Sequence, residues 1–285
     1  MDSAHRASAI AQIVFYAPTV PATLYVGIRA WKYGPRLAWY PAMAFACARL
    51  TGGALVLASQ HDPENTHLLT ATIVLLNIGL VPLIMPFHAL TRIVCFHRVQ
   101  ASFPGDRRKN MFLRVTRFLL FASVLLLSVS GGLYGNPDRS KVQSTLSRVA
   151  YFEFAFVLVA LFGMAAWLYF VARDKIQDGQ VIYIKWLLIA SPILCIRTVF
   201  GIISVFEATG KHFLTSIWSP MFGNAVLFSL MALVPEFIVL CIFVYLGHYR
   251  YSTADQYGLV PRKGLFERSG KKDEGEQTSD SVKMT

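Results

Sequence analysis

Charged residues are scarce in this chain of 285 residues: they make up 15%, and hydrophobic residues make up 55%. A soluble domain carries about 25% charged residues. Apolar runs of about 18 or more residues recur instead, and each is long enough to cross a bilayer core of roughly 30 Å as a helix. The short segments of alternating polarity that a membrane β-barrel needs are missing. The composition therefore predicts an all-α, polytopic membrane protein.

Cysteines are also few, and the motifs of several enzyme classes are missing. Cys47, Cys95, Cys195 and Cys241 fall within or at the ends of apolar runs, so no disulfide framework is predicted. The sequence contains no Gly-rich phosphate loop, no His-Glu-x-x-His, no Cys-x-x-Cys and no nucleophile elbow. We therefore expect no cofactor and no metal site.

The apolar runs predict a bundle of seven transmembrane helices. Their predicted bounds are 10–30, 38–58, 68–91, 112–134, 150–172, 182–206 and 221–247. The first run lacks a charged n-region and a clean cleavage site, which favours a retained helix over a signal peptide. A short segment, 1–9, precedes this membrane domain of residues 10–249. The polar tail, 250–285, has almost nothing to bury and is predicted to be disordered.

The distribution of positive charge predicts the orientation. Most Lys and Arg residues flank one end of the predicted bundle. The opposite end has only Arg6, Arg139, Lys141, Arg148 and Lys211. Because cytoplasmic loops carry the excess of Lys and Arg, we expect a lumenal or external N-terminus and a cytosolic C-terminus. The net charge of +11 then follows from topology and contact with the lipid bilayer, and nucleic acid is not needed to explain it.

Several polar residues lie inside the predicted spans. They are Arg49, Asn77, His88, Glu153, Arg197, Asn224 and Glu236. An ionisable group at the bilayer centre costs about 2.5–3.5 kcal/mol on insertion scales, and such groups usually face the bundle interior and pair. We expect Glu236, which follows Pro235, to face Arg49 or Arg197 across a partly polar cavity. The alternative is that such a pair only fixes helix register, and that Asn77 and His88 only make interhelical hydrogen bonds.

Two segments carry a resemblance to known proteins. "SPILCIRTVFGIISVF" and "GNAVLFSLMALVPEFIVLCIFVYLGHY" resemble a fungal family of seven-helix integral membrane proteins that includes membrane-bound terpene cyclases. Arg197, Pro235 and Glu236 are the marks of this resemblance. It implies an enzyme, an isomerase that closes a prenyl or epoxy-prenyl chain in meroterpenoid biosynthesis. It also implies residence in the endoplasmic reticulum beside a prenyltransferase and an epoxidase.

The chemistry of such a cyclase assigns roles to the intramembrane residues. Glu236 or Glu153 would be the acid that starts cyclisation, because a carboxyl group in an apolar pocket can stay neutral. The other carboxylate, held by Arg49 or Arg197, would orient the site or act as the base. A hydrophobic, prenylated substrate would enter through lipid.

Three further residues are predicted to bind that substrate: Asn77, Asn224 and Phe200. Phe200 is an aromatic residue in the middle of a span, where it could line an apolar pocket.

Two other functions fit the same topology. Lipid-translocating exporters are another seven-helix fungal group, with an Arg-x-x-Tyr-Arg-x-x-Glu pattern in their later helices. Here Arg197-Thr-Val-Phe200-Gly lacks the Tyr and the second Arg. A receptor is the third alternative, although no lumenal cysteine pair is present and the basic loop 173–181 is short.

Overall fold

The computed structural model describes residues 3–33, 36–61, 65–77, 80–96, 106–133, 139–171, 173, 178–207, 216–219 and 223–252. The chain there forms α1 (Ser3–Tyr16), α2 (Thr19–Tyr33), α3 (Arg36–His61), α4 (Thr66–Asn77), α5 (Val81–Phe96), α6 (Asp106–Gly132), α7 (Ser140–Phe170), α8 (Asp178–Glu207), α9 (Ala225–Phe228), the π-helical turn η6 (Ser229–Leu233) and α10 (Val234–Ser252). These ranges contain no strand, which confirms the all-α prediction. The predicted tail beyond Ser252 lies outside the described residues.

Six helical stretches are long and apolar enough to cross a membrane. They are Ala4–Trp31, Ala38–Gln60, Met111–Gly132, Ser140–Phe170, Gln180–Glu207 and Ala225–Tyr251. The predicted third span, 68–91, is not among them, because α4 and α5 are separate helices of 12 and 16 residues. The structure therefore supports a multi-pass membrane protein and leaves the seven-span count and the orientation as predictions.

The first predicted span is broken near its middle. α1 begins at Ser3, within the segment 1–9, and the chain turns at Ala17 and Pro18 before α2 begins. Proline lacks the amide hydrogen that would continue the helix. The Thr19 hydroxyl donates to the Tyr16 carbonyl at 2.8 Å and satisfies one of the acceptors left by the break.

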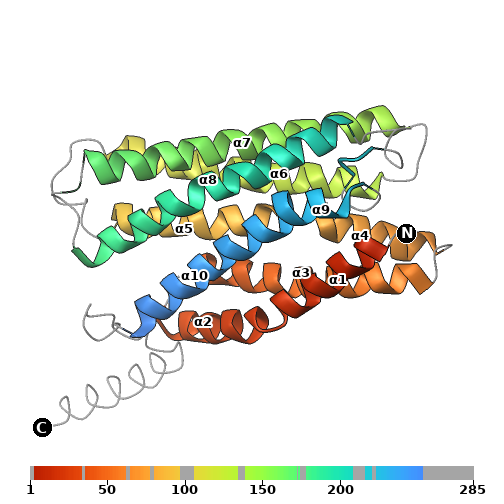
Figure 1. The fold of residues 1–285 in the computed structure, drawn as a ribbon. Coiled ribbons are helices and arrows are strands. Elements are labelled where there is room, and N and C mark those ends of the chain that lie inside the picture. Colours follow the sequence, from red (N-terminus) through yellow and green to blue (C-terminus); the bar gives the residue numbers. More distant parts are fainter. Residues whose placement is uncertain are drawn as a thin grey trace, which may run out of the picture.

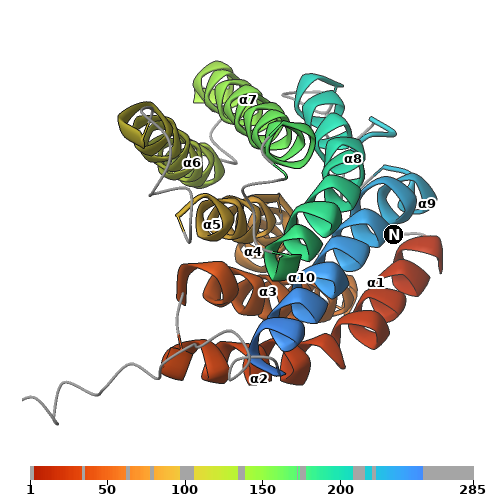
Figure 2. The same cartoon turned by 90° about the vertical axis from the view of Figure 1, so that its left-hand side faces the viewer.

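The helices form two groups with two helices between them (Figures 1 and 2). α6, α7 and α8 pack side by side as one group, and α1, α2 and α3 form the other. α10 contacts α8 on one side and α2 and α3 on the other, and α5 contacts α3, α7 and α8. Residues of α10 can therefore reach both groups.

Large apolar side chains cover much of the outer surface of the bundle. Phe118 is 72% exposed, and Val14 and Phe156 are each 63% exposed. A soluble monomer rarely exposes apolar patches of more than a few hundred Å². The apolar exterior is what lipid requires, and the buried polar residues described next lie inside it.

Candidate functional site: an Arg–Glu–Arg centre between the helix groups

Glu236 lies at the centre of the molecule, in the first turn of α10, and is fully buried. The chain reaches it through the π-helical turn η6 and Pro235. A π-turn widens the helix locally and often occurs at functional sites. A proline adds the loss of one backbone hydrogen bond. The local sequence thus interrupts regular α-helix immediately before the buried carboxylate.

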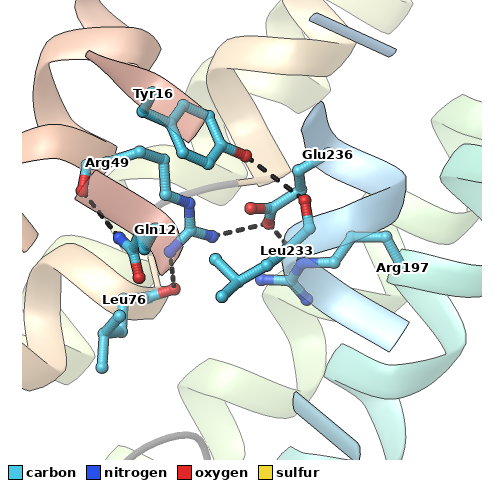
Figure 3. A network of polar contacts seen from close by, with 7 residues as sticks. All are labelled: Gln12, Tyr16, Arg49, Leu76, Arg197, Leu233 and Glu236. Atoms are coloured by element: carbon cyan, nitrogen blue, oxygen red, sulfur yellow. Dashed lines mark hydrogen bonds and ion pairs between the residues drawn. The ribbon is translucent and has the colours of Figure 1, made fainter. Parts of the chain in front are cut away.

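Two arginines from different helices meet at one oxygen of this carboxylate (Figure 3). Arg49 of α3 donates from Nη2 to Glu236 Oε1 at 2.6 Å, and Arg197 of α8 donates from Nε to the same oxygen at 2.5 Å. Both arginine side chains are at least 97% buried. The predicted pairing of Glu236 is confirmed, and it involves both arginines at once. We call these three residues the Arg–Glu–Arg centre.

Neutral polar groups hold Arg49 in place. Gln12 of α1 donates from Nε2 to the Arg49 carbonyl at 2.6 Å, and Arg49 Nη1 makes a longer bond of 3.4 Å to the Leu76 carbonyl. The Tyr16 hydroxyl points to the Leu233 carbonyl in η6, also at 3.4 Å (Figure 3). Sequence analysis missed Gln12 and Tyr16. The one available signal was the amide of Gln12 inside the apolar run "AIAQIVFY".

Aromatic rings complete the walls of the centre. The Arg49 guanidinium carbon lies 5.5 Å from the Phe45 ring centroid, and that of Arg197 lies 5.9 Å from the Phe200 ring centroid. A guanidinium group within about 6 Å of an aromatic face is attracted by the ring quadrupole. The predicted pocket residue Phe200 is thus buried beside Arg197. The centroid of its ring also lies 6.0 Å from that of the Phe228 ring.

The Arg–Glu–Arg centre carries one more positive than negative charge. Two guanidinium groups face one carboxylate, and the structure describes only two other acidic side chains, Glu153 and Glu207. Neither is in an ion pair within the described ranges. Arg197 Nη1, Arg49 Nε and Glu236 Oε2 are buried without a hydrogen-bond partner. The surplus charge is costly in an apolar interior.

A small cavity lies among α1, α3, α4 and α9. It measures about 20 Å³ and therefore has room for about one water molecule. Its walls are His5, Ser8, Ala9, Gln12, Val56, Leu76, Ala225 and Phe228. Gln12 and Leu76 are shared, because both also bond to Arg49. Arg49, Arg197 and Glu236 do not line this cavity, so it is not the cavity that was predicted to lie between Glu236 and its arginines. Its volume is also too small for a prenyl chain.

Glu153 lies away from the centre. Its Oε2 accepts a hydrogen bond of 2.6 Å from the Ser123 hydroxyl of α6. Tyr151, two residues earlier on α7, packs instead against Gly201 of α8. Residues two positions apart point to nearly opposite faces of a helix. The structure therefore does not bring the two predicted carboxylates together.

The remaining polar residues singled out from the sequence are Asn224, His88 and Asn77. Asn224 is exposed and caps α9, where its side chain accepts from the amides of Val226 and Leu227 at 2.9 and 3.2 Å. His88 Nε2 bonds to the Leu113 carbonyl at 3.0 Å, which confirms an interhelical hydrogen bond between α5 and α6. Asn77 is the last residue of α4, and its side chain lies outside the described part of the structure.

A metal site was not expected from the sequence. In the ranges that the structure describes, no three His, Cys, Asp or Glu side chains form a group that could hold a metal ion.

Comparison with protein families gives a match over most of the chain. A family model described as a domain of unknown function (DUF7702) matches residues 3–252, which include every described helix from α1 to α10. No curated protein and no solved structure matches the chain. The description names no activity, so the resemblance to terpene cyclases stays a prediction.

Proposed function

We propose that this chain, which belongs to the family described as a domain of unknown function (DUF7702), is a membrane transporter that moves a small, largely apolar molecule across the bilayer. One observation carries the proposal. A single oxygen of Glu236 binds arginines from both helix groups, directly after a π-turn and a proline.

The position of these ion pairs suits a protein that alternates between two conformations. Arg49 lies in the α1–α3 group and Arg197 in the α6–α8 group, so each ion pair links α10 to a different group. Each pair could break or be exchanged as the groups move. Interrupted helices absorb such movement at a few residues, and packed interfaces tend to have discrete arrangements. The turn through η6 and Pro235 is the natural hinge, because it already departs from regular α-helix.

Cyclisation is the second candidate, and Glu153 is the observation that favours it. Its hydrogen-bond partner is the neutral hydroxyl of Ser123, and among the described residues it forms no ion pair. An acid catalyst needs a carboxyl group that can be neutral. Glu236 fits that role less well, because both arginines already bind its Oε1.

Flux measurements test transport directly. We expect purified protein in phosphatidylcholine liposomes to move a fluorescent amphiphile, and Glu236→Gln to lower the initial rate at least about tenfold, because the shared acceptor loses its charge. Arg148→Gln is the matched control. Arg148 is a half-buried arginine on α7 that stacks on Phe206 at 4.7 Å, outside the centre. Equal flux in wild type and Glu236→Gln would contradict the proposal.

Product analysis distinguishes a cyclase from a transporter. The same liposomes are supplied with an epoxy-farnesyl aromatic substrate, and the products are examined by mass spectrometry and NMR. A cyclised isomer whose formation is lost in Glu153→Gln, without movement of the amphiphile, would favour the cyclase and reject the transporter.

A further inference from the structure

We infer that Tyr16 is a positioning residue for Glu236. Its hydroxyl exchanges the Leu233 carbonyl for Glu236 Oε2 when Arg197 leaves the Arg–Glu–Arg centre. This inference rests on the proposed transport function, because the two helix groups must move apart for Arg197 to leave. Three features of the described residues point to it: an acceptor without a donor, a donor in a long hydrogen bond, and the attachment of α1 to α3.

The first feature is the second oxygen of the carboxylate. Both arginines bind Oε1 of Glu236, whereas Oε2 is buried without a hydrogen-bond partner among the described residues. A buried acceptor without a donor loses the hydrogen bonds that water would give it. Oε2 is therefore available to a further donor that comes within reach.

The second feature is the bond that the Tyr16 hydroxyl makes. It donates to the Leu233 carbonyl at 3.4 Å, whereas hydrogen bonds between oxygen atoms are usually about 2.7–2.8 Å long. A hydroxyl has one hydrogen to donate, so a bond to Oε2 must replace the bond to Leu233. A carboxylate accepts stronger hydrogen bonds than a neutral carbonyl does, which favours the exchange.

Leu233 and Glu236 are close enough together for one hydroxyl to serve either of them. Positions three apart lie on the same face of a helix, and Leu233 directly precedes α10, which carries Glu236 in its first turn. In Figure 3 the Tyr16 side chain extends from α1 toward both residues, and the charge of Glu236 acts on Tyr16.

The ring of Tyr16 is held between α3 and α10. Its centroid lies 5.9 Å from that of Phe45 and 5.8 Å from that of Phe237, both in edge contacts. Tyr16 is also only 1% exposed. The ring therefore cannot swing away, and a small displacement of α10 is enough to change which acceptor its hydroxyl meets.

The third feature determines which arginine Tyr16 replaces. Gln12, one turn before Tyr16 on α1, donates to the Arg49 carbonyl at 2.6 Å, and α1 packs along α3. Tyr16 and Arg49 therefore move together, whereas Arg197 lies on α8 in the other group. When α10 stays with the α1–α3 group, separation of the groups removes Arg197 from Glu236. Tyr16 then supplies at Oε2 the donor that Arg197 supplied at Oε1.

The exchange also connects the carboxylate to the hinge. Ser229 and Leu233 are the first and last residues of η6. The Ser8 hydroxyl lies 2.8 Å from that of Ser229, and Tyr16 bonds to Leu233. Ser8 and Tyr16 lie about two turns apart on one face of α1, so α1 contacts both ends of η6. Release of the Leu233 carbonyl removes one of these contacts and allows the hinge to change.

Removal of Arg197 tests the exchange without transport. In Arg197→Gln we expect the Tyr16 hydroxyl to bond to Glu236 permanently. Infrared spectra of the full chain in phosphatidylcholine nanodiscs report this bond through the carboxylate stretching band of Glu236, which is identified as the band that Glu236→Gln lacks. Adding Tyr16→Phe should shift this band in the Arg197→Gln chain and leave it in place in the otherwise wild-type chain.

Tyr40→Phe is the matched control for the infrared experiment. The Tyr40 hydroxyl on α3 is buried without a hydrogen-bond partner among the described residues, so its loss should leave the Glu236 band in place in both chains. Circular dichroism shows whether Arg197→Gln is folded, and Arg197→Met repeats the comparison with an apolar side chain. If Tyr16→Phe does not shift the band in a folded Arg197 variant, the inference is overturned.

Flux measurements need no substitution at Arg197. In the liposome assay we expect Tyr16→Phe to lower the initial rate of movement of the fluorescent amphiphile at least about tenfold, as loss of a hydrogen bond to a charged group predicts. Tyr40→Phe should move the amphiphile as fast as wild type does. Equal rates in wild type and Tyr16→Phe would also overturn the inference.

The infrared and flux experiments can fail separately. If the band shifts as expected and wild type moves no amphiphile, transport is rejected and the bond between Tyr16 and Glu236 stands. If wild type moves the amphiphile and the band does not shift, transport stands and the role of Tyr16 is rejected.

Discussion

A carboxylate in the middle of an apolar helix costs about 2.5–3.5 kcal/mol on insertion scales, and Glu236 offsets that cost through two guanidinium groups. The sequence predicted this pairing because ionisable groups at similar depth in lipid must find one another. It did not predict that both arginines share one oxygen, because depth says nothing about the direction in which a side chain leaves its helix. Gln12 was missed for a related reason: one neutral amide in an apolar run is usually a minor contact.

Removing one member of the Arg–Glu–Arg centre should cost far more than removing all three. Glu236→Ala leaves two buried guanidinium groups without their acceptor and is expected to cost about 3–5 kcal/mol of stability. Replacing the centre together, as Arg49→Met, Arg197→Met and Glu236→Leu, should change stability little or raise it by about 1–4 kcal/mol. Thermal unfolding of the protein in detergent measures both effects.

Glu153→Gln is the control for this comparison. Its partner, Ser123, is neutral, so the amide can keep a hydrogen bond and the expected cost is about 1 kcal/mol or less. If Glu236→Ala is no less stable than Glu153→Gln, the three charges are not coupled as the structure describes.

Helix packing decides which polar residues meet, and the sequence does not show how each helix is rotated about its axis. Glu153 and Arg197 have similar predicted depths, but α7 presents Tyr151 to α8 and Glu153 to α6. Only the rotation of α7 about its own axis fixes that choice. The apolar residues of α7 surround it too evenly to indicate which face is buried. The structure therefore places Glu153 away from the Arg–Glu–Arg centre, and the roles predicted for the two carboxylates stay predictions.

The contact between α7 and α8 gives a prediction at the scale of elements. Gly201 of α8 lies under the Tyr151 ring, and an added Cβ would overlap Tyr151 Cε1 and lie 2.9 Å from Cδ1. Gly201→Ala must move that ring or separate the helices, at an expected cost of about 1–3 kcal/mol. Gly163→Ala on α7 is the matched control, because nothing lies within 4 Å of its Cβ position. That substitution should stabilise by about 0.5–1 kcal/mol.

Thermal unfolding of the two glycine variants in the same detergent separates packing from helix propensity. Opposite signs are expected for Gly201→Ala and Gly163→Ala. A stabilised Gly201→Ala would mean that α7 and α8 are not in close contact at this point.

The molecule as a whole is apolar outside and polar along one internal line. That line runs from the cavity at His5 through Gln12 to the Arg–Glu–Arg centre. Composition alone predicted the apolar exterior. The predicted third span, 68–91, stays a prediction, because α4 ends at Asn77 and α5 begins at Val81. The sequence did not predict this internal line of polar residues, because the line joins residues far apart in the chain. Arg49 and Glu236, for example, are more than 180 positions apart.

The orientation of the whole molecule can be tested at the two ends of α8. A helix of 30 residues is about 45 Å long and exceeds a hydrocarbon core of roughly 30 Å. Arg173, just before α8, and Glu207, its last residue, are both exposed. The excess of Lys and Arg places Arg173 on the cytosolic side and Glu207 on the lumenal or external side. Single cysteines are introduced as Arg173→Cys or Glu207→Cys in a chain whose four native cysteines are replaced by alanine.

A membrane-impermeant maleimide then reports the side of each thiol. In cells whose plasma membrane alone is permeabilised, Arg173→Cys should react at once. Glu207→Cys should react only after detergent opens all membranes, if the protein resides in the endoplasmic reticulum. Labelling of Glu207→Cys in intact cells would move the protein to the plasma membrane with the same orientation. Reaction of Glu207→Cys and protection of Arg173→Cys in the permeabilised cells would reverse the orientation.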